Sequence, residues 1–233
     1  MLNNPFIQKQ LTLQFQKRKK LNYKIKVIIV DDHAILRAGI NQILCATDDI
    51  EVIAEAQNGA EAIKFSRQFD ADVMLLDISM PDRSGMEVLK YIKGENSHIA
   101  VLMLSMHMEE QYAVRALKSG AAGYLCKQSA SSDLLNAIRT VAKGKKFITP
   151  EVAEILADQV GMEKPQSPHE TLSDREFQTM VMISSGLSVG EIADQLSLSV
   201  KTVSMYRTRL LEKMHLRHNA ELTHYAIKNN LVY

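Results

Sequence analysis

Five polar residues stand where apolar runs of the chain end, and their side chains could together handle a phosphoryl group. Asp31 and Asp32 follow KVIIV, Asp77 closes ADVMLLD, Ser105 closes IAVLMLS and Lys127 follows AGYLC. A charge at the end of a buried strand costs free energy unless it is paired, hydrogen-bonded or bound to a metal. Each residue by itself could instead cap a helix, end a strand or stay solvated.

The chemistry of the five groups is complementary. Three carboxylates placed together would raise one another's pKa. A hard divalent cation removes that cost, and Mg²⁺ favours sites built from one or two carboxylates, a phosphate and water. The Lys127 ammonium is a point charge suited to a phosphoryl oxygen, and the Ser105 hydroxyl is a hydrogen-bond donor.

The elements that would position these residues follow from the hydropathy pattern. Strand-like runs at 26–30, 50–56, 71–77, 99–105 and 122–126 alternate with segments whose apolar residues recur at three- and four-residue spacing, such as Ile35, Ile40, Ile43 and Leu44. Such alternation predicts parallel βα units and a doubly wound α/β sheet. In that fold the carboxyl ends of the strands share one edge, so the five polar residues should converge there.

The motifs VDDH (30–33), DISMP (77–81), MLSMH (103–107) and GYLCK (123–127) make this part of the chain resemble the receiver domain of two-component response regulators, a flavodoxin-like (βα)5 fold. The resemblance implies that a sensor histidine kinase phosphorylates Asp77. It further implies a Mg²⁺ ion held by Asp32, Asp77 and the main-chain carbonyl of Ser79, with Asp31 acting through water, and a switch built from Ser105, Tyr124 and the phosphate-binding Lys127. In that switch we expect Ser105 to turn towards the phosphoryl group and Tyr124 to move inward behind it.

Two positions depart from the usual receiver pattern, and the role of His33, next to the acidic pair, is left open. Serine stands at 105 where threonine is more usual, and it keeps the hydroxyl. Asp82 stands where glycine is common, for which we expect a changed loop and little else. His33, directly after the acidic pair, is as well explained by packing or capping as by a function.

The C-terminal part of the chain reads as helical. A helix is expected at 151–160, followed by the linker-like stretch GMEKPQSPHE. Ser173 with Glu176 has the form of a capping box, so a helix should begin at Asp174. Helical segments are expected at 174–185, 189–196, 200–214 and 219–229, with Ser199 as the cap of the third.

The segment 189–214 reads as a helix-turn-helix, in which the second helix enters the major groove of DNA. Its outer face holds little apolar surface, and five Lys or Arg residues but one acid lie between 201 and 217. An ordinary helical hairpin with a solvated face is the alternative. The candidates for reading bases are Ser204, Met205 and Thr208, and those for binding phosphates are Lys201, Arg207, Arg209 and Lys213.

The stretches TLSDREFQ, GLSVGEIADQLSLSVKTV and ELTHYAIKNNLV resemble the LuxR/NarL-type output domain, and YRTRLLEKM with the last of them is most similar to the GacA/UvrY branch. The resemblance implies a homodimer, formed on phosphorylation through Leu222, Tyr225 and Ala226, that binds an inverted repeat in double-stranded DNA. We expect the unphosphorylated receiver, held by the 151–160 helix, to cover the recognition helix.

The bulk composition agrees with a two-domain regulator. A chain of 233 residues suits two domains: a receiver at 25–146, a linker with one helix at 147–169 and a DNA-binding domain at 170–233, after a basic tail at 1–24. The first 26 residues carry seven basic and no acidic side chains, which leaves the remainder acidic. Two distant cysteines and the lack of a membrane-length apolar run predict a cytoplasmic protein.

Two other functions are alternatives to a phosphorylation-controlled transcription factor. Phosphatases of the haloacid dehalogenase type also use an Asp at a strand end, but they place a second Asp two residues later, where this chain has Ser79. A DNA-binding protein with a degenerate, phosphate-independent receiver is the other, and the complete set of acidic, hydroxyl and lysine residues counts against it. The sequence therefore predicts a regulator and no enzyme.

Overall fold

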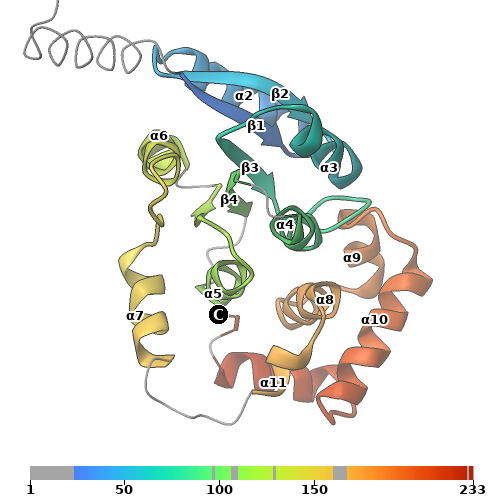
Figure 1. Ribbon diagram of the computed structural model, residues 1–233. Coiled ribbons are helices and arrows are strands. Elements are labelled where there is room, and N and C mark those ends of the chain that lie inside the picture. Colours follow the sequence, from blue (N-terminus) through green and yellow to red (C-terminus); the bar gives the residue numbers. More distant parts are fainter. Residues whose placement is uncertain are drawn as a thin grey trace, which may run out of the picture.

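The computed structural model describes residues 24–95, 98–105, 110–127, 130–159, 167–229 and 231–232, so the expected basic tail lies outside the described residues except for Lys24. Five parallel strands form one sheet in the order β2-β1-β3-β4-β5 (Figure 1). Their bounds are β1 Ile25–Val30, β2 Ile50–Ala56, β3 Val73–Asp77, β4 Ala100–Ser105 and β5 Gly123–Cys126. The predicted doubly wound sheet is confirmed.

Helices cover both faces of this sheet, as a parallel sheet requires. They are α2 Ala34–Cys45, α3 Gly59–Gln68, α4 Gly85–Gly94, α5 Glu110–Lys118 and α6 Ala130–Val141. Side chains alternate along each strand, so Val27 and Ile29 pack with α2 and α6, whereas Ile28 and Val30 pack with α3, α4 and α5. Strand β3 is buried along its whole length, which explains why its sequence is apolar as far as the terminal Asp77.

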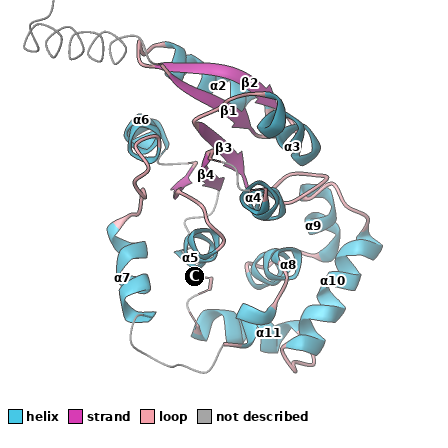
Figure 2. Cartoon of the chain, in the orientation of Figure 1, coloured by secondary structure: helices cyan, strands magenta, loops and turns pink. Residues whose placement is uncertain are grey.

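The C-terminal domain is helical in the described residues (Figure 2). After α7 Pro150–Gln159 and the short 3₁₀ helix η1 Pro168–Thr171 come α8 Asp174–Ser184, α9 Val189–Gln195, α10 Val200–Lys213 and α11 Asn219–Lys228. The capping box of Ser173 and Glu176 is present, and the Ser199 hydroxyl accepts from the backbone N–H of Thr202. These helix starts are confirmed, because a local side-chain hydrogen bond defines each of them.

The two domains pack on each other through α8, which lies between α4 and α5 of the receiver and α9 to α11 of its own domain (Figure 1). Every residue of α8 is buried. The Asp174 carboxylate binds Lys90 on α4 at 2.7 Å and Arg115 on α5 at 3.0 Å. The rings of Tyr112 and Phe177 meet edge to face at 5.0 Å.

The expectation that the receiver covers the recognition helix is therefore wrong for this structure. The helix against the receiver is α8, whereas Lys201, Ser204 and Thr208 on α10 are exposed and Met205 is 40 % exposed. The physical reason is that α8 carries the larger apolar surface, which both domains can bury, while the outer face of α10 is polar.

Candidate functional sites

The predicted residues meet at the carboxyl edge of the sheet. Neighbouring strands bring Asp77 opposite Leu104 and Ser105 opposite Cys126. The Lys127 ammonium lies 2.7 Å from Asp31 Oδ2 and 2.9 Å from Asp77 Oδ2. Asp31 and Asp77 are 0 % and 1 % exposed, so this is a buried ionic cluster.

Burial dominates the protonation of the central carboxylate. It raises the pKa of Asp77 to about 6, and the Asp31 charge adds to the increase, while Lys127 and the backbone N–H of Ser79 oppose it. Burial also opposes the charged form of Lys127, but Asp77 and Asp31 together raise the pKa of its ammonium. Lys127 therefore stays charged beside a carboxyl group that titrates near pH 6.

We expect Asp77→Asn to stabilise the metal-free protein at pH 7.5. Because the folded pKa of Asp77 lies above its usual value of 3.8, the folded state binds the proton more tightly, and this group lowers stability as pH rises from about 4 to 6. Replacing it should raise the free energy of unfolding by about 1–3 kcal/mol. Urea unfolding in EDTA measures this, and the gain should vanish near pH 4. An unchanged or lower stability at pH 7.5 would contradict it.

The residues present fit a divalent cation. One ligand atom from each of Asp31, Asp32, His33 and Asp77 lies within 4.8 Å of the others. Lys127 pairs with one oxygen each of Asp31 and Asp77, and His33 with one oxygen of Asp32. An ionised carboxylate has about four lone-pair sites, so these three groups keep lone pairs for a cation. Hard carboxylate oxygens are the ligands that Mg²⁺ prefers.

His33 is the member of this cluster that sequence reasoning left open. It occupies the N-cap position of α2 without a side-chain cap, and its Nδ1 lies 2.8 Å from Asp32 Oδ1 and 3.2 Å from Asp31 Oδ1. Its place directly after the acidic pair was the available signal. In the structure its ring lies within reach of both carboxylates.

The loop after Asp77 is held by the receiver at two points. A Cβ at Gly85 would lie 2.0 Å from the Asp77 carbonyl oxygen, so only glycine allows this close approach. The Asp82 carboxylate accepts from the backbone N–H groups of Gly59 at 2.8 Å and Ala60 at 2.9 Å. The expectation that Asp82 changes little beyond the loop is wrong, because it binds the N-terminus of α3.

The switch residues are both buried. Ser105 is 2 % and Tyr124 8 % exposed. The Tyr124 ring already lies inward in this conformation, because it packs in the core cluster on the α3–α5 face of the sheet. The expected inward movement is therefore already complete here.

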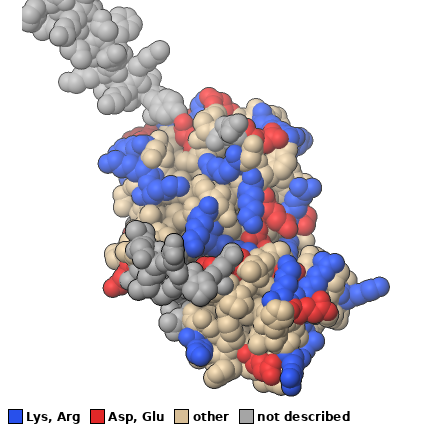
Figure 3. Space-filling model, turned by 60° about the horizontal axis from the view of Figure 1, so that its bottom comes forward, with Lys and Arg blue, Asp and Glu red and all other residues tan. Residues whose placement is uncertain are grey.

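On the recognition helix α10, the structure sorts the predicted residues into two groups. Lys201, Ser204, Met205, Thr208 and Arg209 are exposed, as contacts to DNA require. Arg207 Nε instead donates to Asn219 Oδ1 at 2.7 Å, and Lys213 binds Glu176 at 2.7 Å. In Figure 3, Lys and Arg side chains project on the side where α10 lies, with acidic side chains between them.

The predicted dimer contacts on α11 need correction. Leu222 and Ala226 are fully buried within the domain, and the Tyr225 hydroxyl binds His169 Nδ1 at 2.8 Å. Helix α11 packs this side on α8, so Leu222 and Ala226 cannot meet a second chain without unfolding the domain, whereas Tyr225 is partly exposed. Its outward side carries Ala220, Thr223, His224 and Ile227, and Ile227 is 55 % exposed.

A parallel five-stranded sheet with an acidic edge, joined to a helix-turn-helix, defines a response regulator with a DNA-binding output domain. Family comparison agrees: residues 27–139 match the response regulator receiver domain, and residues 170–226 match the bacterial regulatory proteins of the luxR family. The chain belongs to the two-component response regulators with a LuxR-type output domain. It is a transcription regulator and not an enzyme.

This chain is similar to known response regulators over nearly their whole length. The response regulator UvrY of Escherichia coli (strain K12) is 41 % identical over 208 residues, which cover 89 % of this chain and 95 % of that protein. The response regulator GacA of Pseudomonas syringae pv. syringae (strain B728a) is 36 % identical over 211 residues, covering 89 % and 98 %. The predicted similarity to the GacA/UvrY branch is confirmed.

Solved structures of the same architecture are also similar. RcsB of Salmonella typhimurium aligns with a TM-score of 0.61 at 27 % identity over 87 % of this chain and 96 % of that chain. RcsB of Salmonella enterica serovar Typhimurium bound to promoter P1flhDC with the phosphomimetic BeF3- aligns with a TM-score of 0.59 at 28 % identity, covering 87 % and 98 %. Within the described part of this chain, no helix is long and apolar enough to cross a membrane.

Proposed function

We propose that a sensor histidine kinase transfers a phosphoryl group to Asp77, and that this controls binding of the chain to DNA. The observation that carries the proposal is the buried cluster in which Lys127 lies within 2.9 Å of both Asp31 and Asp77. A structural ion pair needs one carboxylate, whereas two carboxylates around one ammonium, with Asp32 beside them, leave negative charge for a cation to neutralise.

Asp31, Asp32, Asp77 and the Ser79 carbonyl would hold Mg²⁺. When bound, the ion would supply Lewis-acid stabilisation of the negative charge on the phosphoryl oxygens. The protein's own residues do the rest. A carboxylate oxygen of Asp77 attacks the phosphorus atom as its bond to the nitrogen of the kinase histidine breaks, which leaves the histidine free. Lys127 binds a phosphoryl oxygen, and the Ser105 hydroxyl donates to another. The phosphoryl group adds a charge of about −1.5 to −2. This charge shifts the equilibrium between the inactive and active conformations only through contacts that differ between them.

The DNA interface in this proposal is the exposed face of α10. Met205 and Thr208 would contact base edges, while Lys201 and Arg209 would bind phosphates. Arg207 and Lys213 are weaker candidates, because each already binds a residue of the same domain. A DNA-binding regulator acts in the cytoplasm, where the phosphodonor kinase domain also lies.

We expect Lys201→Ala to weaken binding to all DNA sequences about equally and to reduce the salt slope of log K by about 1, because one phosphate contact and its released counterion are lost. Met205→Ala should instead change the preferred sequence and leave the salt slope unchanged. Footprinting and binding titrations at several salt concentrations distinguish the two. A sequence-dependent effect of Lys201→Ala would contradict this assignment.

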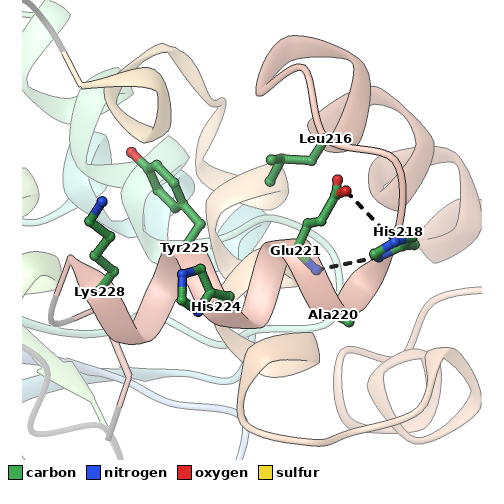
Figure 4. A pocket seen from close by; sticks show the side chains of 7 residues that line it. All are labelled: Leu216, His218, Ala220, Glu221, His224, Tyr225 and Lys228. Carbon is green, nitrogen blue, oxygen red and sulfur yellow. Dashed lines mark hydrogen bonds and ion pairs between the residues drawn. The ribbon is translucent and has the colours of Figure 1, made fainter.

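The dimer in this proposal forms through the outward side of α11. Ala220, Thr223, His224 and Ile227 recur at helical spacing, and Ile227 is the exposed large apolar side chain among them. A shallow hollow adjoins this side (Figure 4), lined by Leu216, His218, Ala220, Glu221, His224, Tyr225 and Lys228. A second copy of α11 fits this surface by two-fold symmetry, and two recognition helices related that way would read an inverted repeat.

The experiment that tests the proposed function follows assembly and DNA binding together. With acetyl phosphate and Mg²⁺, we expect dimers in sedimentation and a stronger footprint on an inverted repeat. Ile227→Glu should remain monomeric under these conditions and lose at least about tenfold in affinity, because a desolvated carboxylate at the contact costs roughly 2 kcal/mol or more. Ile148→Glu, at an exposed isoleucine of the linker before α7, is the control. A dimer of Ile227→Glu with wild-type stability would refute this interface.

A further inference from the structure

Two residues of the output domain contact the loop that follows the phosphoacceptor. Gln178 Nε2 on α8 donates to Ser79 Oγ at 3.0 Å, and Arg175 Nη2 donates to the Met80 carbonyl at 3.0 Å. Arg175 Nη1 also donates to Gln178 Oε1 at 3.0 Å, which fixes which end of the amide faces Ser79. Gln178 and Arg175 are 3 % and 5 % exposed, so these bonds are shielded from water.

Ser79 lies between the output domain and the phosphorylation site. Its backbone N–H interacts with the Asp77 carboxylate, while its hydroxyl accepts from Gln178. The receiver holds the two ends of the loop, because Ile78 N–H donates to the Leu104 carbonyl and Gly85 N–H to the Ile78 carbonyl. The polar atoms of Ser79 and Met80 on the outer side of the loop are bound by α8.

The buried guanidinium of Arg175 has an unusual set of partners. Among the described residues it forms no ion pair, and it donates to the side-chain amide oxygen of Gln178 and the main-chain carbonyl of Met80. Burial lowers the pKa of Arg175, a sign that the charge is partly desolvated. A desolvated charge makes hydrogen bonds to neutral acceptors strong and geometrically demanding.

We propose that Gln178 and Arg175 are positioning residues of the metal and phosphorylation site, so that the docked output domain completes a site otherwise built by the receiver. This inference rests on the proposed function, because Ser79 supplies a metal-binding carbonyl only there. The clamp restricts the Ser79–Met80 loop to one conformation, and a cation then binds without having to order it. By reciprocity, cation binding favours docking of α8 by the same factor.

The test measures binding of Mn²⁺, a paramagnetic substitute for Mg²⁺, to the full chain by the loss of the free-ion signal in electron paramagnetic resonance. Gln178→Ala should raise the Kd about threefold to tenfold, at or below the range for residues that orient a metal ligand. Ser79→Ala removes the same bond from its other side and should have a similar effect. The double variant should be no worse than the weaker-binding single variant, because both remove one interaction.

A control on the same helix separates positioning from general damage to α8. Ser184 is buried at the other end of α8, and its hydroxyl has no hydrogen-bond partner among the described residues. Ser184→Ala should keep the wild-type Kd. Should Gln178→Ala fail to fold, as judged by circular dichroism, Ser79→Ala and Arg175→Lys carry the test, because lysine keeps the charge but cannot reach both acceptors in the same fork geometry.

The outcomes assign failure to one proposal or the other. Mg²⁺ should compete for the Mn²⁺ site, and Asp32→Asn should abolish binding. If the wild type binds no Mn²⁺, or Asp32→Asn binds it normally, the proposed function fails at its metal site and this inference falls with it. If the wild type binds, Asp32→Asn does not, and Gln178→Ala and Ser79→Ala stay within twofold of the wild-type Kd, the positioning role alone is refuted. Additive effects in the double variant refute it equally.

Discussion

We expect Asp77→Asn to abolish phosphoryl incorporation from acetyl phosphate in the presence of Mg²⁺. The amide is a poor nucleophile and also removes one of the clustered carboxylates that would hold the cation, so both requirements of the reaction are lost. We expect labelling to fall below about 1 % of the wild-type rate, a loss of more than about 2.7 kcal/mol in transition-state stabilisation. Intact-protein mass spectrometry after a short incubation measures the incorporated phosphate.

Asp82→Asn is the matched control for this experiment. Asp82 lies five residues away in the same loop and outside the carboxylate cluster, and an asparagine there keeps one oxygen that can accept from the backbone N–H of Gly59, although the bond from Ala60 is lost. It should therefore label at close to the wild-type rate. Stoichiometric labelling of Asp77→Asn would show that another side chain is the acceptor.

The second large effect is expected at the interface between the domains. Asp174→Asn removes the carboxylate that binds both Lys90 and Arg115, and it leaves the Arg115 guanidinium 5.0 Å above the Phe177 ring without its counterion. Because Lys90 is half exposed, solvent screens part of the loss. We expect docking of α8 to weaken by about 1–3 kcal/mol, or roughly fivefold to 150-fold.

Hydrogen exchange followed by mass spectrometry measures this prediction on the peptide that covers α8. Exchange should be faster in Asp174→Asn than in the wild type, and Glu212→Gln, on the exposed part of α10, should leave it unchanged. Affinity for a single DNA half-site should stay within about twofold, because the outer face of α10 is already exposed. Unchanged protection of α8 would mean that apolar packing alone holds the domains together.

The interface also bears on how a phosphoryl group could control this chain. The recognition helix is open to solvent, so covering it cannot be the means of inhibition in this conformation. The contact that phosphorylation could change is the one between α8 and the loop that follows Asp77. Regulation through domain arrangement and dimer formation is therefore a better explanation than unmasking of α10.

The sequence alone was sufficient for the elements and for the receiver site, because both depend on local rules. Alternating β-branched runs and helical periods define five βα units, and parallel strands necessarily bring Asp31, Asp77, Ser105 and Lys127 to one edge. The helix starts at Asp174 and Val200 follow from the preceding serines, Ser173 and Ser199. Each serine accepts a hydrogen bond from the backbone N–H three residues later. The same reasoning failed for Ile35, which fits the helical period yet is 91 % exposed, because periodicity does not show where a helix leaves the sheet.

What only the tertiary structure decided is which surfaces face each other. Leu222 and Ala226 have the pattern of an interface, but the pattern cannot say whether the partner is a second chain or α8 of the same domain. No sequence pattern indicated the contacts of Asp82, Arg175 and Gln178. Their partners are backbone groups and a serine that lie far away in the sequence. The hydrophobic effect has no direction, so the sequence does not show which helix of the output domain packs on the receiver. That α8 does so, and not α10, is seen only once both domains are folded and their apolar surfaces are in contact.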